Sequence, residues 1–301
     1  MFLSHFHTRG FTLQLAAFAV AFISCEKAVD IIPSNLDPVV VVEGTIENNQ
    51  PPVVVLTRSL AFFEQLSAQD FANSFVRNAN VFVSDGSRRV RLTEYRRQVG
   101  NANFYFYSVD STNPAQLMIG RLNTSYKLEI EADGKLYTAN TSIPDISRKV
   151  DSLWWQKAPG NKDSTLAVVF SRVTDPKGYG NYIRYFTSVN DSAFLPGSNS
   201  VFDDKFVDGT TYDIQVFRGF NRNVEFDPET FGFFKRGESV KVKMSNIDKA
   251  TYDFWRTWEQ NQSNVGNPFG VPVKVLSNLS AGATGIFAGY ASQITSINIP
   301  K

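Results

Sequence analysis

The chain of 301 residues contains one cysteine, Cys25, and two histidines, His5 and His7. All three precede residue 26, so the rest of the chain carries neither a thiol nor an imidazole. Ser-His-Asp and Cys-His nucleophile systems need an imidazole base, and His/Cys zinc sites need ligands that this part of the chain lacks. Those classes are therefore excluded beyond residue 25, and we expect no enzymatic activity, no cofactor and no metal.

An excess of charge of either sign is also missing. The 30 Lys and Arg residues nearly balance the 29 Asp and Glu residues. Nucleic acids bind to basic surfaces that neutralise phosphates, so we expect no nucleic-acid partner. Carboxylate chemistry stays open, because a pair of Asp or Glu side chains suffices for glycan hydrolysis, but no motif here pairs any two of them.

The N-terminus carries a short apolar run over residues 11–23, which follows Arg9 and ends at Ser24. A basic start, an apolar middle and a small residue at the cut predict a secretory signal over residues 1–24. The run is shorter than the roughly 20 residues that a transmembrane helix needs. We therefore expect this segment to be cleaved rather than to span a membrane.

Cys25 follows the apolar run directly, as in a bacterial lipobox, where the thiol is acylated and becomes the new N-terminus. Phe22 departs from that pattern, because leucine is usual at its position. We predict lipidation of Cys25 and a tether over residues 25–38, whose polar, proline-containing sequence can hold a folded body away from the membrane. The alternative is an ordinary signal peptide with an incidental thiol.

From residue 39 the sequence alternates short Val- and aromatic-rich runs with turn residues. Asp85-Gly86, Asp133-Gly134 and Asp208-Gly209 suit hairpin turns, whose central residues need positive φ. Regular spacing of short strands is typical of β-sandwiches. The fold class is therefore predicted to be mainly β, with two β-sandwich domains of the immunoglobulin or fibronectin type.

Pro144 interrupts the strand pattern and predicts a boundary between an N-terminal sandwich at residues 39–147 and a C-terminal one at 148–301. The second half is expected to include a strand at residues 204–207 and to close with one at 292–299, after a Gly-rich segment. One amphipathic helix is predicted near residues 246–261. Ser245 is expected to cap it, with Asp248 completing a capping box.

Trp154 and Trp155 are candidate ligand contacts. Adjacent strand residues face opposite ways, so one ring should enter the core while the other points outward, where it could stack on a sugar ring. Packing within the protein is the competing interpretation. Phe231, Phe233 and Phe234 form a second candidate contact surface, unless their segment folds under the sandwich as a strand edge.

Asp203, Asp204 and Asp208 are a weak calcium candidate. They lack the spacing of an EF-hand loop, and turn acids before Gly209 are expected from backbone preference alone. No metal ligand is assigned from the sequence.

The C-terminal motifs Asn267-Pro268-Phe269-Gly270, Ser277-Asn278 and Gly285-Ile286-Phe287-Ala288-Gly289-Tyr290 resemble the closing signature of a Bacteroidota envelope lipoprotein family. The strand Val42-Glu43-Gly44, after a Cys-Glu-Lys start, is similar to it as well. That family is known only as a domain of unknown function and is often encoded beside TonB-dependent outer-membrane receptors. The resemblance covers the chain after the signal and implies no catalytic residues.

These observations predict a non-enzymatic lipoprotein, held by its lipid on one of the two faces of the outer membrane. The resemblance implies a role as an accessory to a TonB-dependent receptor barrel in nutrient uptake. The alternative is a surface glycan-binding module or a carboxylate-dependent glycan hydrolase with a carbohydrate ligand.

Overall fold

The computed structural model describes residues 37–60, 67–100, 102–221, 224, 227–265, 267, 270–271 and 273–301. Contacts divide the chain into Met1–Asp37 and Pro38–Lys301, and the second unit is compact. The predicted signal, Cys25 and nearly all of the tether lie outside the described residues. Within the described part, no helix has the length and apolar character needed to cross a membrane.

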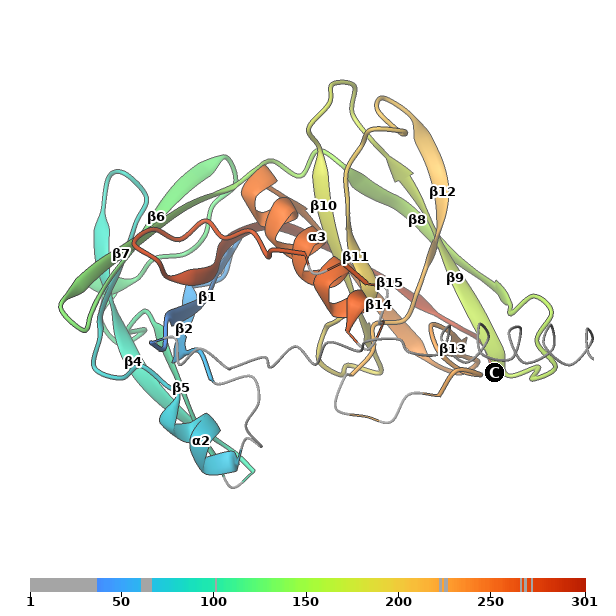
Figure 1. The fold of residues 1–301 in the computed structure, drawn as a ribbon. Coiled ribbons are helices and arrows are strands. Elements are labelled where there is room, and N and C mark those ends of the chain that lie inside the picture. The colour runs from blue at the N-terminus through green and yellow to red at the C-terminus, as the bar shows by residue number, and fades with distance from the viewer. Residues whose placement is uncertain are drawn as a thin grey trace, which may run out of the picture. The chain divides into compact units, whose positions relative to one another are not determined.

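Strands dominate the described residues, so the prediction of a mainly β chain is confirmed (Figure 1). The elements are β1 (Val40–Glu47), β2 (Val53–Arg58), α2 (Ala68–Asn73), β3 (Asn80–Ser84), β4 (Arg89–Val99), β5 (Ala102–Ser108), the short 3₁₀ helix η1 (Pro114–Gln116), β6 (Thr124–Ala132), β7 (Lys135–Ile143), β8 (Lys149–Lys157), β9 (Leu166–Thr174), β10 (Tyr182–Val189), β11 (Leu195–Phe202), β12 (Thr211–Val216), β13 (Phe234–Lys235), β14 (Ser239–Ile247), α3 (Lys249–Asn264) and β15 (Thr284–Asn298).

Eleven strands form one sheet in the order β11-β10-β14-β15-β1-β2-β5-β4-β3-β6-β7. A second sheet has β9 at its centre, paired with β8, β12 and β13. Most neighbours are antiparallel, but β15 and β1 run parallel. The larger sheet therefore contains strands from both halves of the sequence. The predicted boundary at residues 147/148 falls between β7 and β8 and stays a prediction.

Strand β15 connects the two halves because its own two ends pair with different strands. Thr284–Tyr290 pair with β1, and Tyr290–Asn298 pair with β14. Residues 285–291 are all buried, because both faces of this stretch are covered. The prediction of a Gly-rich connection followed by a strand at residues 292–299 is corrected here: the strand already begins at Thr284. Buried strands of this kind lack the alternating polarity by which half-exposed strands are recognised.

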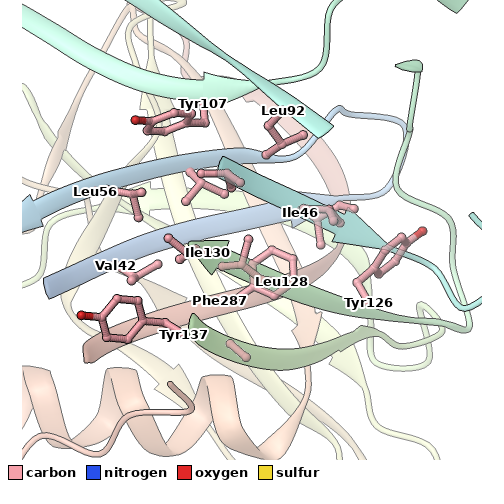
Figure 2. Packing of buried hydrophobic residues seen from close by; sticks show 14 of the residues in the cluster. Val42, Ile46, Leu56, Leu92, Tyr107, Tyr126, Leu128, Ile130, Tyr137 and Phe287 are labelled. Atoms are coloured by element: carbon pink, nitrogen blue, oxygen red, sulfur yellow. The ribbon is translucent and has the colours of Figure 1, made fainter. Parts of the chain in front are cut away.

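The core of the first half lies inside strands β1–β7 and the start of β15. Figure 2 shows Phe287 from β15 among side chains of the first half, including Val42, Leu128 and Tyr137. Phe287 is 0% exposed. Next to it, β7 lies beside β15, where the backbone N–H of Gly289 donates to Thr141 Oγ1 at 2.8 Å.

The second half is a two-layer arrangement. The apolar residues between β9, β12 and β13 on one side and β10 and β14 on the other form its core. Helix α3 covers the opposite face of β10, β14 and β15, where Phe254 packs with Ile286 and Tyr290. Successive residues of β15 thus alternate between the first-half core and the helix, as the strand period of two requires.

Helix α3 begins at Lys249, slightly later than predicted, and its N-cap is Asp248. Asp248 Oδ1 accepts a hydrogen bond from Thr251 N at 2.8 Å. Its other oxygen accepts from Thr141 Oγ1 and Ser142 N, both at 2.9 Å. The predicted cap Ser245 lies instead inside β14 and is buried. The true cap therefore ties the helix to β7, a contact that local sequence does not reveal.

One further prediction is wrong, and one strand was not predicted. Residues 204–207 form a turn rather than a strand, closed by backbone hydrogen bonds from Val207 N and Asp208 N to Asp204 O. The strand between β10 and that turn is β11, which the sequence analysis missed. Pro196 and Gly197 hide it, but β11 is an edge strand, where both residues are tolerated.

A substitution at Gly285 can test the close approach of β15 to β1. It has φ +112°, and a Cβ atom there would lie 2.0 Å from the carbonyl oxygen of Val42. We expect Gly285→Ala to lower the unfolding free energy by about 3 kcal/mol or more, because steric overlap adds to the backbone strain. Urea denaturation measures this loss.

Gly282→Ala is the matched control, because Gly282 also has positive φ but a Cβ atom there would meet nothing within 4 Å. It should cost only the backbone strain of about 1–2 kcal/mol. Equal losses in the two variants would contradict the close β1–β15 contact.

Candidate functional site

A cavity of about 660 Å³ lies between the two layers of the second half. Its walls come from β10, β11 and β14 on one side and from β9 and β12 on the other. The edge strands β11 and β12 border its mouth, and the rings of Phe206 (97% exposed) and Phe217 (50% exposed) belong to its lining. The cavity therefore opens to solvent between these two strands.

The lining is mostly apolar, with polar side chains in the minority. The apolar and aromatic members are Val173, Ile183, Tyr185, Val201, Phe202, Phe206, Val207, Tyr212, Ile214, Val216, Phe217, Phe231, Val242, Met244 and Tyr252. Burial and, to a smaller extent, the nearby Glu259 raise the pKa of Tyr185 to about 12. Its hydroxyl therefore stays protonated at neutral pH. The volume and lining match those of pockets that hold small organic molecules.

Arg148 forms the polar end of the cavity. Its side chain is 3% exposed, and its Nε lies 3.2 Å from Asp175 Oδ1 and 3.0 Å from the Tyr212 hydroxyl. The guanidinium also donates to the carbonyl oxygens of Asn181 and Asp203, each at 3.2 Å. A buried guanidinium is costly unless its donors are used, and this one is surrounded by acceptors. Sequence analysis missed Arg148, because it lies in a polar segment that looked like a linker.

Trp154 and Trp155 face opposite sides of β8, as predicted. Trp155 packs against the second-half core, with the Arg236 guanidinium 5.8 Å from its ring centre. Trp154 lies on the other face and stacks on Phe170, with the ring centres 5.7 Å apart. Both rings are partly buried, and neither lines the cavity.

Phe231, Phe233 and Phe234 do not form a common surface. Phe231 lines the cavity. Phe233 packs on the small cluster around Leu166 and Val168. Phe234 is 0% exposed in β13, so the prediction that it contacts a ligand or partner is corrected. The segment is a strand edge folded under the sandwich, the other interpretation that the sequence allowed.

A carboxylate cluster lies beyond the polar end of the cavity. One oxygen from each of Asp175, Asp204 and Asp208 falls within 4.8 Å of the others. Asp203, which the sequence analysis had grouped with the latter two, points elsewhere: it lies 3.5 Å from Lys205 Nζ and accepts from the Tyr252 hydroxyl at 3.2 Å. Asp175 was missed because it is distant in sequence from the other two.

A second buried polar group attaches α3 to the sheet. Glu259 of α3 accepts hydrogen bonds from Ser200 N at 3.0 and 3.2 Å. The Arg184 guanidinium carbon lies 3.4 Å from the centre of the Trp255 ring, and Arg184 donates to Ser200 Oγ at 3.1 Å. Burial raises the pKa of Glu259, although Ser200 and Arg184 oppose the shift. This group lies behind β11, away from the cavity lining, and serves to position the helix.

The chain belongs to the family described as Domain of unknown function (DUF4249), whose model matches residues 26–296. No curated protein matches the chain. The family match begins at the residue after Cys25 and ends near the last residue of β15.

Glu259 makes stability depend on pH. Because its pKa is raised from 4.5 in the folded state, its contribution is full below pH 4.5 and is lost as the pH rises through the folded pKa. The wild type should therefore lose stability relative to Glu259→Gln as the pH increases from 4.5 towards neutrality. Denaturant titrations at several pH values measure this difference.

Glu129→Gln is the control of opposite sign, because hydrogen bonds from Arg89 and Lys127 lower the pKa of Glu129. There the wild type should gain on the variant as the pH rises towards 4.5, with no further gain above that pH. A Glu259→Gln difference that is flat, or that changes in the same direction as the control, would contradict the assignment.

Proposed function

We propose that this member of the family is a lipid-anchored, non-enzymatic binding protein of the outer membrane that assists a TonB-dependent receptor in nutrient uptake. The observation that carries the proposal is the open apolar cavity of the second half. A protein that collects or presents a ligand needs such a site, and it needs no catalytic group.

The proposed anchor is Cys25. It follows the apolar run directly, and the family match starts at the next residue. The first strand begins at Val40, so a short polar segment separates the acylation site from the folded unit. A single acyl chain binds membranes only weakly and reversibly, so stable attachment needs a second anchoring signal as well.

The proposed ligand is a small, mainly apolar molecule with one polar group. Its apolar part would be buried between β10 and β12, where each Å² of apolar surface removed from water contributes about 25 cal/mol. Its polar group would face the end of the cavity that Arg148 and Tyr212 form. Phe206, at 97% exposed, offers apolar surface at the mouth to a receptor that covers the bound ligand.

A glycan-binding role is the second candidate, and it rests on Trp154. Its ring lies on the outer side of β8 with the Arg172 guanidinium 5.8 Å from its centre. Stacking on Phe170 already covers part of the ring, which leaves less surface for a sugar than a platform tryptophan offers. Saturable glycan binding that Trp154→Ala abolishes would favour this role over the apolar ligand.

The cavity can be tested by filling it. Ile214 lies in β12 on the cavity wall, and Ile214→Trp should occupy much of the space. We expect organic extracts of the protein, purified in lipid nanodiscs, to contain at least about tenfold less of a co-purifying apolar compound. Mass spectrometry of the extracts measures it. Ile294→Trp, on the exposed side of β15, should leave the amount unchanged.

The proposed role as a receptor accessory is tested by co-purification. Gentle extraction of membranes should recover the wild-type protein together with an outer-membrane barrel. Recovery of the protein alone, or no compound that differs between wild type and Ile214→Trp, would count against the proposal.

The anchor is tested separately by Cys25→Ser. Without the thiol no acyl chain can be attached, so the variant should move from the membrane fraction to the soluble fraction and lose incorporation of labelled palmitate. A variant that remains in the membrane fraction without label would show that something other than Cys25 holds the protein there.

A further inference from the structure

Three carboxylates from two separate turns meet in the second half of the chain. Asp175 follows β9, whereas Asp204 and Asp208 belong to the turn between β11 and β12. Their facing oxygens lie within 4.8 Å of one another, and Asp175 and Asp204 are each only 2% exposed. Like charges at this separation repel strongly where little water screens them. The arrangement needs a compensating positive charge.

Asp175 is the member of the cluster whose carboxylate lacks well-aligned hydrogen-bond donors. Its side chain is 0% exposed, and neither carboxylate oxygen accepts a well-aligned hydrogen bond. Arg148 Nε lies 3.2 Å from Oδ1 and supplies charge without a well-directed hydrogen bond. Burial raises the pKa of Asp175. Arg148 and the Gly209 amide oppose this, while Asp204 and Asp208 add to it. Buried polar atoms are nearly always paired, so unpaired oxygens aimed into an acidic cluster point to a missing ligand.

The other two carboxylates are held in position by backbone amides. Asp204 Oδ2 accepts from Gly180 N at 2.8 Å and from Asn181 N at 2.9 Å. Asp208 Oδ1 accepts from Gly178 N at 2.5 Å. Despite its burial, the pKa of Asp204 is lowered by these donors, so it stays ionised. The turn after β9 therefore fixes two carboxylates of the turn between β11 and β12 against Asp175.

We propose that Asp175, Asp204 and Asp208 form a calcium-binding site. All three donors are carboxylate oxygens, which hard divalent cations prefer. Three carboxylates beside one guanidinium leave two negative charges, which one such ion neutralises. The three oxygens all lie within 4.8 Å of one another, so one ion with ligands at roughly 2.3–2.6 Å can contact all of them. Calcium accepts such irregular carboxylate sites, whereas magnesium demands near-ideal octahedral geometry and usually keeps several waters.

Calcium binding is not part of the proposed function, but the proposed calcium site shares one turn with the cavity. The turn that carries Asp204 and Asp208 also contributes Asp203, Phe206 and Val207 to the cavity lining. An ion bound beneath this turn would fix the cavity end that these residues form. Calcium binding itself can be measured without any knowledge of the cavity ligand, so the two proposals can fail independently.

The test is a calorimetric titration of chelator-treated, full-length protein with CaCl₂ and then with MgCl₂, together with thermal unfolding in each salt. We expect one saturable calcium site, with a dissociation constant at or below the roughly 10⁻⁴–10⁻³ M typical of extracellular modules, and an increase in Tm with calcium. Magnesium should bind at least about tenfold more weakly.

Asp175→Asn and Asp208→Asn should each weaken calcium binding at least about tenfold, because each removes a charged ligand. Asp208 is less buried than Asp175, so its variant keeps the test valid if Asp175→Asn does not fold. Asp191→Asn, whose side chain is 78% exposed, is the matched control and should bind as the wild type does. The proposal would be overturned if the wild type showed no saturable calcium binding, if both variants bound calcium as tightly as the wild type, or if the wild type bound magnesium as tightly as calcium.

Discussion

Strand β15 pairs with β1 through its first half and with β14 through its second half, and Tyr290 takes part in both pairings. Alternate side chains of residues 284–290 of β15 enter two different cores. Phe287 packs in the core of the chain's first half, while Ile286 and Tyr290 pack under α3. A strand buried on both faces cannot leave one core without opening the other. The two halves of the chain are thereby coupled through hydrogen bonds and packing in the same residues.

Buried and half-buried polar groups then fix the elements around this strand. Asp248 caps α3 and bonds β7, while Arg184 and Glu259 hold the same helix against β11 and Tyr290. Arg148 joins the segment before β8 to β14 through two hydrogen bonds with Asn246. Because buried charges are costly when unpaired, each of these groups is satisfied in one arrangement only. The cavity and the carboxylate cluster both depend on Arg148 being held this way.

Local sequence predicts much of this fold but little of its site. The mainly β class and the Asp133-Gly134 hairpin between β6 and β7 follow from short-range rules, and both residues have the positive φ that such a turn needs. The rules fail where tertiary contacts decide: β15 lacks alternation because both its faces are buried, and β11 carries a proline that only an edge strand tolerates. Arg148 and Asp175 resemble ordinary polar residues until the fold brings them together with Tyr212 and Asp204.

If β15 makes the described body one cooperative unit, native-state hydrogen exchange should show it. The slowest amides of β1, β15 and β14 should exchange through a common opening, with the same free energy and the same denaturant dependence. Exchange of β1 and the first half of β15 at a clearly lower free energy, while β14 remains protected, would contradict it.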